Sequence, residues 1–336
     1  MSGHDKGGDK IRLSIAEAKD VGAKALRGIG YSAEDAAYIV DHLVLNAASG
    51  YPFAGLPRIM AVRDAPERKM PVTSIKVVKE PPVSLQIDGG NQIAYVAVTK
   101  AAEMALAKVK KSGICIMGMG NSWYSGRLAN YVEPAARAGY VAIHLSSAIP
   151  IVAPHGAARP LFGTNPICIA MPKKPDPVIV DVGTAQTMWG HVLLQAFLGI
   201  PLPEGHGIDA KGRPTTDAAE VVKGAILPIA EHRGSALSFA VQALSLMGAS
   251  VVPWDEYRGW GYLFVFFDPD LLCPRERFEH DLGALIAKMK ALPKREGVSE
   301  ILIPSERSYV ARKESEKNGI LFDRKVIDEL KAMAKG

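Results

Sequence analysis

The sequence has few of the features that mark secreted or membrane-bound proteins. It contains only three cysteines in 336 residues, and their odd number and apolar surroundings indicate reduced core residues at Cys115, Cys168 and Cys273. No run of about 18 apolar residues predicts a membrane span. The polar, glycine-rich N-terminus shows no secretory signal. We therefore expect a soluble, cytoplasmic protein.

The sequence also has no block of basic residues. The 40 lysines and arginines are scattered among 35 acidic residues, so the net charge is only +5. Such a distribution makes nucleic acid an unexpected partner, whereas the small positive excess favours an anionic substrate or a phosphate-bearing cofactor.

Three common catalytic signatures are missing. There is no Gly-x-Ser-x-Gly elbow for a serine nucleophile, and no pair of histidines at helical spacing with a carboxylate that would predict a metal site. The run Gly118-Met119-Gly120-Asn121 lacks the third glycine and the following helix of a dinucleotide fingerprint. We interpret this run as a tight turn that leaves a strand, and we predict no Rossmann fold.

The hydrophobic pattern predicts helices and strands in an irregular order. Ser32, followed by Glu34 and Asp35, predicts a helix start, and Asp88-Gly89-Gly90-Asn91 predicts a turn after a strand. The lack of regular strand-helix alternation favours a mixed α/β fold over a doubly wound one. Helical spacing covers residues 14–45, 98–110, 237–247, 276–292 and 325–334, and strand patterns cover 83–87, 113–119, 140–145, 167–171, 178–182 and 261–267.

Several motifs occur in a fixed order along the chain. Asn121–Leu128 reads NSWYSGRL, Val152–Gly156 reads VAPHG, and Leu161–Pro166 reads LFGTNP; Asp181–Thr184 and Pro304–Arg307 follow. In order and spacing they resemble the malate/L-lactate dehydrogenase family of type 2, which includes ureidoglycolate, sulfolactate and diketogulonate enzymes and Δ1-piperideine-2-carboxylate reductase. The resemblance covers nearly the whole chain.

The resemblance implies a fold, an assembly and an activity. The expected fold is mixed α/β, with a mostly antiparallel central sheet under helical cover. Its expected parts are an N-terminal helical part (1–80), a central NAD(P)-binding domain (81–258) and a C-terminal part (259–336) that packs with the N-terminal helices. The protein is expected to form a homodimer. It is expected to transfer hydride between NADH or NADPH and a small carboxylate-bearing 2-oxo acid, 2-hydroxy acid or cyclic imino acid.

The resemblance also assigns residues to the cofactor. Backbone amides in glycine-rich turns can approach phosphate oxygens, and arginines can pair with them, although simple turn geometry would explain the same glycines. Arg127 and Arg233 favour NADPH over NADH. Thr164 and Asn165 are expected to bind substrate. The residues expected to line the dinucleotide are Asn121, Ser122, Ser125, Gly126, Arg127, Leu128, Ser146, Ser147, Asp181, Val182, Gly183, Thr184, Arg233, Ser305, Glu306 and Arg307.

One departure from the family pattern concerns the substrate site. Family members carry a Ser-His-Gly-x-x-Arg run whose histidine donates a proton, whereas Phe53–Arg58 reads FAGLPR here. The serine and histidine are absent, and Arg58 is retained. A fixed guanidinium suits a substrate carboxylate, so we predict that Arg58 is the carboxylate clamp, the alternative being an ordinary surface arginine.

A second departure concerns the proton donor. Tyr124 stands where the family has another histidine, yet hydride addition to a carbonyl builds negative charge that an acid must meet. Tyr124 is the first candidate donor, because a nearby cation such as Arg58 or Arg127 lowers the pKa of a phenol from about 10. His232 is the second. The alternatives are an aromatic pocket wall for Tyr124 and a capping or cofactor-contacting residue for His232.

Two wider alternatives remain open at this point. A protonated cyclic imine brings its own proton, which would offset the missing histidine at Ala54. A protein that binds dinucleotide as a sensor or assembly factor, without redox chemistry, would also tolerate that loss. The retained Arg58 and the motifs at 163–166 and 304–307 favour the enzyme.

Overall fold

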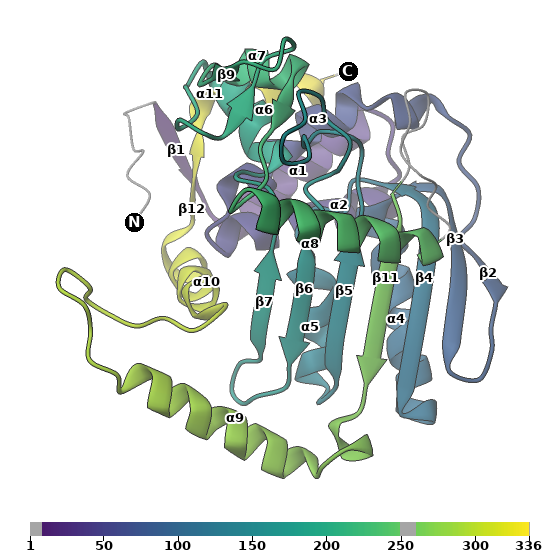
Figure 1. The fold of residues 1–336 in the computed structure, drawn as a ribbon. Coiled ribbons are helices and arrows are strands. Elements are labelled where there is room, and N and C mark those ends of the chain that lie inside the picture. Colours follow the sequence, from purple (N-terminus) through teal and green to yellow (C-terminus); the bar gives the residue numbers. More distant parts are fainter. Residues whose placement is uncertain (1–8, 249–259, 336) are drawn as a thin grey trace. The chain divides into compact units, whose positions relative to one another are not determined.

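The computed structural model describes residues 9–248 and 260–335, and the chain divides into two compact units (Figure 1). The first unit combines Met1–Met70 with Arg307–Gly336, and the second is Pro71–Glu306. The boundary predicted after residue 80 lies inside the second unit, and the boundary predicted after 258 lies outside the described residues.

The first unit is a group of helices closed by a small antiparallel ribbon. Ser14 and Glu17 form a capping box at the first helix, and Ser32 accepts a hydrogen bond from the backbone N–H of Asp35 at 3.0 Å, which confirms the predicted helix start. The N-terminal and C-terminal parts of the chain are joined by two strands, which pair from Lys10↔Asp323 to Leu13↔Ile320. The elements are β1 (Lys10–Leu13), α1 (Ile15–Gly28), α2 (Ala33–Ala48), η1 (Pro52–Ala54), α3 (Arg58–Asp64), η2 (Pro66–Lys69), α10 (Glu306–Asn318), β12 (Ile320–Asp323) and α11 (Arg324–Met333).

The second unit is built on a seven-stranded sheet within the described residues. Its order is β2-β3-β4-β11-β5-β6-β7, and every neighbouring pair is antiparallel except β3–β4. The predicted mixed α/β fold with a mostly antiparallel sheet is therefore confirmed. The strands are β2 (Lys76–Lys79), β3 (Ser84–Ile93), β4 (Ile114–Trp123), β5 (Val141–Ser146), β6 (Ile167–Met171), β7 (Val178–Val182) and β11 (Tyr262–Phe267).

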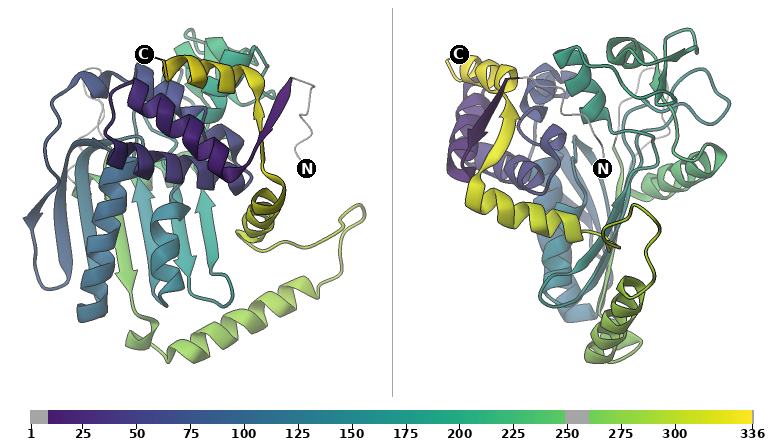
Figure 2. Two further views of the ribbon diagram at one scale, coloured as in Figure 1. Left: turned by 180° about the vertical axis from the view of Figure 1, so that it is seen from behind. Right: turned by 90° about the vertical axis from the view of Figure 1, so that its left-hand side faces the viewer.

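Helices cover the two faces of this sheet unequally. α4 (Ala94–Ser112) and α5 (Ala129–Arg137) lie along one face, as Figure 2 shows from behind, whereas α8 (His232–Ser245) crosses only one end of the opposite face (Figure 1). Val241 of α8 packs there on Leu145 and Leu263. A smaller lobe holds α6 (Trp189–Leu198), β8 (Gly207–Ile208), β9 (Pro214–Thr215), α7 (Ala218–Lys223) and β10 (Ala225–Ile226); η3 (Leu246–Gly248) and η4 (Pro269–Leu271) are short turns.

Below α8 the same face carries a row of apolar side chains. The registers place Ile116, Val265, Ile143, Ile169 and Val180 side by side on five adjacent strands, and each keeps some solvent exposure. α9 (Arg275–Lys290) extends away from this sheet (Figure 1), and none of its residues is buried. We call the row of five residues the open sheet face.

Two predicted turns lie inside strands instead. Asp88–Asn91 belongs to β3, where the register against β4 shifts between Asp88 and Gln92, and Gly90 and Asn91 have left-handed φ values of 64° and 54°. Gly118–Asn121 belongs to β4. Its glycine is needed for close packing, because a Cβ at Gly118 would lie 2.7 Å from the carbonyl oxygen of Met247. Both predictions were wrong because a β-bulge, and a close contact between two backbone segments, require glycine and asparagine just as a turn does.

The three cysteines differ in burial. All are free thiols, as predicted, but only Cys115 and Cys168 are buried. Cys273 is half-exposed just before α9, so it is not the core residue that its sequence neighbours predicted. In the part of the chain that the structure describes, no helix combines the length and apolar character that crossing a membrane requires.

We predict that Arg275 stabilises the second unit. Its guanidinium donates to both carboxylate oxygens of Asp268 at 2.9 Å and lies over the Tyr140 ring at 5.4 Å. Arg275→Met should lower the free energy of unfolding by about 1–3 kcal/mol at neutral pH, measured by urea unfolding. Arg277→Met removes a more exposed partner of Asp281 on the same helix and is the matched control.

The effect should depend on pH in a defined direction. Burial opposes ionisation of Asp268, but the hydrogen bonds from Arg275 and the Asp270 amide outweigh it and lower its pKa. A lowered pKa stabilises the fold above the ordinary aspartate value of about 3.9. The difference between wild type and Arg275→Met should shrink below that pH. A loss no greater than that of Arg277→Met would refute this account.

Candidate active site

Four of the segments predicted to bind cofactor or substrate meet at one end of the sheet, whereas Ser305 contacts Ile179 near the other end of β7. Tyr262, at the start of β11, pairs with Met119 of β4 on one side and with Ser146 of β5 on the other. Further along the sheet, Leu145 of β5 pairs with Ile167 of β6, which pairs with Val182 of β7. The segments 121–128, 146–147, 164–165 and 181–184 therefore gather at this end, although they are far apart in sequence. We call it the motif end of the sheet.

Backbone strain is concentrated in the same segments. Among the described residues, seven other than glycine have a positive φ. Four of them, Asn121, Tyr124, Asn165 and Ser305, belong to the predicted site, and Ala230 and Glu231 directly precede His232. Left-handed backbone at a bulky residue such as Tyr124 is unfavourable and persists where the surrounding structure imposes it, which is typical of functional sites.

Bonds to β3 hold the segment that leads to Tyr124. The Asn121 side-chain amide donates to Asp88 at 2.6 Å, the Ser122 hydroxyl donates to the carbonyl of Gln92 at 2.6 Å, and the Trp123 indole N–H donates to the carbonyl of Asn91 at 3.1 Å. These bonds fix the end of β4 and place the Tyr124 backbone just beyond it.

Aromatic side chains surround Tyr124. Its ring meets Trp123 edge-on at 5.4 Å and Trp260 at 5.8 Å. Both tryptophans are buried, at 3% and 4% exposure, whereas Tyr124 is only half-buried. Of the three rings, Tyr124 is therefore the one that solvent or a substrate can reach.

Asp181 and Arg127 face each other inside the protein. An Asp181 carboxylate oxygen accepts from the Ala129 amide at 2.9 Å, at the start of α5, and lies 3.9 Å from Nε of Arg127. Burial raises the pKa of Asp181, although Arg127 and the amides of Ala129 and Leu128 oppose the rise. The Arg127 side chain is 9% exposed, so its charge is directed at Asp181 rather than at solvent. This pair holds the Ser125–Leu128 turn onto α5.

Most of the predicted hydroxyl groups are used internally. Ser146 donates to the carbonyl of Ser147, Ser147 accepts from the amide of Gly261, and Thr184 donates to the carbonyl of Thr164. Asn165 is fully buried, and its amide donates to the Ser238 carbonyl and the Gln242 side chain, which ties the LFGTNP motif to α8. Thr164 is also buried. The exposed residues in these segments are Asn121, Gly126 and Val182.

The second candidate donor lies at the start of α8. His232 is the first residue of that helix and is exposed, with its ring 6.1 Å from His155. Arg233 beside it is also exposed. The adjoining loop is fixed by a hydrogen bond of 3.1 Å from the His155 amide to the Ser235 hydroxyl.

The C-terminal motif runs along the edge strand β7. The hydroxyl of Ser305 accepts from the backbone N–H of Ile179 at 3.0 Å. Glu306 pairs with Lys290 at 2.5 Å, which together with the Ile303 amide lowers its pKa against the effect of burial. Arg307, the next residue, is exposed.

Arg58 lies in the first unit, at the first position of α3. The turn before it is tightly held: the Asn46 side chain donates to the Ala54 carbonyl at 3.0 Å, and the Arg58 amide donates to the carbonyl of Gly55 at 3.0 Å. Gly55 is required there, because a Cβ would lie 2.8 Å from Ala47. The Ala54 side chain is half-buried, and Arg58 is also half-buried.

Sequence reasoning missed several supporting residues. Asp88, which holds Asn121, was assigned to a turn, and Asn46 carried no signal because it lies within an apolar helix pattern. Trp260 follows the segment that the structure does not describe. Its proximity to Tyr124 depends on β11 pairing with β4, which no local pattern predicts.

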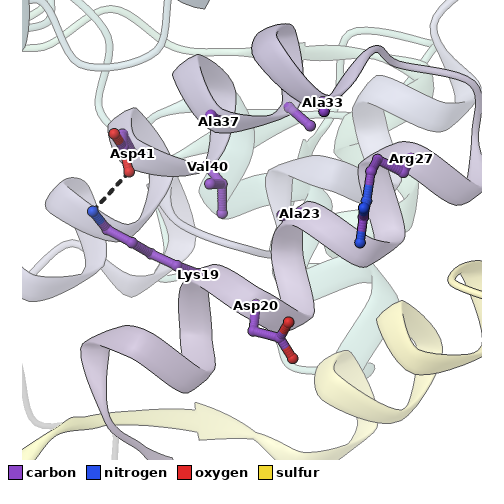
Figure 3. A pocket seen from close by; sticks show the side chains of 9 residues that line it. Lys19, Asp20, Ala23, Arg27, Ala33, Ala37, Val40 and Asp41 are labelled. Atoms are coloured by element: carbon purple, nitrogen blue, oxygen red, sulfur yellow. Dashed lines mark ion pairs between the residues drawn. The ribbon is translucent and has the colours of Figure 1, made fainter.

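A shallow groove in the first unit is unrelated to these residues. It lies between α1 and α2, with alanines such as Ala23 and Ala37 beside an ion pair of 2.7 Å between Lys19 and Asp41 (Figure 3). None of its nine lining residues belongs to the predicted site.

The family model for malate/L-lactate dehydrogenase matches residues 13–331. The chain belongs to the malate/L-lactate dehydrogenase family. It is 30% identical over 334 residues to malate/(S)-sulfolactate dehydrogenase of Methanothermus fervidus, covering 96% of this chain and 97% of the relative. It is 34% identical over 261 residues to a Δ1-pyrroline-2-carboxylate/Δ1-piperideine-2-carboxylate reductase of Pseudomonas putida, covering 74% of each.

The solved structures of the malate/L-lactate dehydrogenase family agree with this assignment. A dehydrogenase from Sinorhizobium meliloti superposes with a TM-score of 0.88 at 25% identity and covers 97% of this chain and 99% of its own. The chain is therefore an NAD(P)-dependent oxidoreductase, as its motifs predicted. Nothing in these comparisons favours the dinucleotide-binding alternative without redox chemistry.

The motif end of the sheet is consistent with a dinucleotide of the kind that malate/L-lactate dehydrogenases use. Gly126, with a φ of 64°, and the neighbouring left-handed residues turn backbone groups out of the strand pattern, where they can meet phosphate or ribose oxygens. The exposed guanidinium of Arg233 supplies positive charge within the second unit.

Proposed function

We propose that the protein is a cytoplasmic NADPH-preferring reductase of small 2-oxo acids or cyclic imino acids, which can also run the reverse oxidation. The observation that carries the proposal is the strained, aromatic-lined motif end of the sheet in a chain of this family. The nicotinamide supplies or accepts the hydride when it is bound. The residues of the chain bind the cofactor, orient the substrate and transfer the proton.

We assign cofactor binding to exposed backbone groups and to a charged arginine side chain rather than to side-chain hydroxyls. The exposed segment around Asn121 and Gly126 offers backbone groups, while internal bonds use the hydroxyls of Ser146, Ser147 and Thr184. Arg127 is committed to Asp181, so we attribute the preference for NADPH to the exposed Arg233. A guanidinium suits a 2′-phosphate because it can form two parallel hydrogen bonds.

Substrate orientation is assigned to Arg58 and proton transfer to Tyr124. The turn around Arg58 is fixed by Asn46 and Gly55, which holds the backbone from which the Arg58 side chain extends, and a substrate clamp needs such a fixed base. Tyr124 is the reachable ring of its aromatic cluster, and its hydroxyl can donate to a developing alkoxide. His232 is kept as the second candidate because it is exposed at a helix start.

We also propose that the protein is a homodimer. The open sheet face has five partly exposed apolar residues that no helix of the described residues 9–248 and 260–335 covers, and α9 has no buried residue. α8 carries some of its apolar residues outward, with Leu237 at 50% and Phe239 at 64% exposure, whereas Val241, Ser238 and Gln242 are buried. Such contiguous apolar surface is typical of an interface between subunits.

The activity is tested by mixing purified protein with NADPH or NADH and a panel of 2-oxo acids and cyclic imino acids, following nicotinamide absorbance. We expect turnover with a higher kcat/KM for NADPH. Arg58→Ala should raise the KM for the carboxylate substrate at least about tenfold, because the clamp is lost, while cofactor affinity stays unchanged. Arg27→Ala, an exposed arginine of the same unit, is the control. Tight cofactor binding with no turnover on any substrate would support the sensor alternative instead.

The donor is tested with Tyr124→Phe, which removes one hydroxyl and keeps the ring. For 2-oxo acids kcat should fall about 10²-fold or more, with little change in KM, because only the proton donor is lost. For cyclic imines, which arrive protonated, the fall should be smaller. His232→Gln should leave kcat within about threefold. A collapse in His232→Gln with full activity in Tyr124→Phe would transfer the role to His232.

The dimer is tested by analytical ultracentrifugation. Wild type should sediment with twice the 36.0 kDa chain mass. Phe239→Glu should weaken association at least about 100-fold, because it places a charge in the apolar interface. Val78→Glu changes an equally exposed residue on the edge strand β2 and should leave the mass unchanged. A monomeric wild type would exclude this assembly.

A further inference from the structure

A connection in the first unit links α10 to the end of α2. Nε of Arg312 donates to the hydroxyl of Ser49 at 2.8 Å, and that hydroxyl donates to the carbonyl of Leu45 at 2.6 Å. The hydroxyl of Ser315, one turn further along α10, donates to the carbonyl of Ala48 at 3.1 Å. Two residues of α10 thus hold the last turn of α2: Ser315 binds it directly, and Arg312 binds it through Ser49.

This contact satisfies groups that a helix leaves open at its C-terminus. The carbonyls of Leu45, Asn46 and Ala47 accept from backbone amides just after the helix, and the Ala48 carbonyl accepts from Ser315. The partial negative charge at this helix end attracts a cation. Ser49 is 2% exposed, so its bond to a guanidinium is shielded from water. The Arg312 guanidinium also lies over the Tyr309 ring at 5.3 Å, which restricts its position.

The end of α2 in turn controls the segment that leads to Arg58. The Tyr51 amide donates to the carbonyl of Asn46 at 3.1 Å, and the Asn46 side chain donates to the Ala54 carbonyl at 3.0 Å. Arg58 follows three residues after Gly55, whose carbonyl accepts from its amide. Only Ser49 and Gly50 separate the end of α2 at Ala48 from the turn that begins at Tyr51, so a shift of the helix end is passed on to this turn.

We propose that Arg312 is a positioning residue for substrate binding: through Ser49 it fixes the end of α2 and so the turn that presents Arg58. The proposal rests on the proposed role of Arg58 as the carboxylate clamp. Arg312 does not touch the substrate. Its loss lets the turn at Tyr51–Arg58 sample other conformations, and the guanidinium of Arg58 is then in place for only a fraction of the time.

The test combines kinetics with hydrogen exchange on the full-length protein. Arg312→Leu should raise the KM for the carboxylate substrate at least about fivefold, with kcat and cofactor affinity within about twofold, because the clamp is misplaced but present. Arg312→Lys keeps a donor for Ser49 and should recover most of the affinity. Lys313→Leu removes an exposed cation from the same helix and is the control.

Hydrogen exchange decides the proposal independently of turnover. In Arg312→Leu the amides of Tyr51, Ala54, Gly55 and Arg58 should exchange at least about fivefold faster, with α1 and α11 unchanged. Unchanged exchange at these four amides would overturn the proposal, and equally faster exchange throughout the first unit would reduce Arg312 to a general stabilising role. If wild type shows no turnover, the proposed activity fails while the exchange result still shows whether Arg312 holds this turn.

Discussion

β11 is the strand on which the second unit depends. It arrives late in the chain and inserts between β4 and β5, with hydrogen bonds to both, so it sets their registers at once. Tyr262, Phe264 and Phe266 point to one side and are fully buried, and Phe264 stacks on His144 at 3.6 Å. Burial lowers the pKa of His144 to about 3, although the Leu263 carbonyl opposes this, so the imidazole is a neutral part of the core. Without this strand, β4 and β5 would have no shared neighbour to join them in one sheet.

The chemistry follows from those registers. Because β4 and β5 run parallel to each other on either side of β11, both end at the same side of the sheet, and β7 ends there too. The left-handed residues lie at this end of the sheet: Asn121 near the end of β4, Tyr124 just beyond it, and Asn165 just before β6 begins. Hydrogen bonds from Asn121, Trp123 and Asn165 to neighbouring elements support this strained backbone, and those of Trp123 and Asn165 are buried. The sheet thus holds unfavourable backbone in place, which suits the hydride-transfer site that we propose there.

Sequence patterns predicted the elements of this fold better than their connections. The Ser32 cap, β5, β6 and β7 follow from local spacing and capping chemistry, and the expected mixed α/β fold came from motifs spread along the chain. Local patterns failed at Asp88–Asn91 and Gly118–Asn121, where glycines serve a bulge and a close contact within strands. They also gave no sign that Asp181 caps α5, that Trp260 meets Tyr124, or that Arg312 reaches Ser49. Each of these contacts joins residues far apart in sequence, and only the folded registers bring them together.

Ala54, which stands where family members carry a proton-donating histidine, limits how this protein can protonate its substrate. The Ala54 methyl group has no proton to give, and the Ala54 carbonyl already accepts from Asn46, so in the proposed site this turn contributes orientation through Arg58 and no acid. In the proposed site, reduction of a carbonyl then depends on the donor assigned to Tyr124, or on His232 as the second candidate. A cyclic iminium needs no donor, because its nitrogen already carries the proton and loses its charge as hydride adds. Aromatic rings such as Tyr124 also favour a cation over an anion at close range. Under the proposed assignment of Arg58 and Tyr124, charge and proton balance therefore both favour cyclic imino acids over 2-oxo acids as substrates.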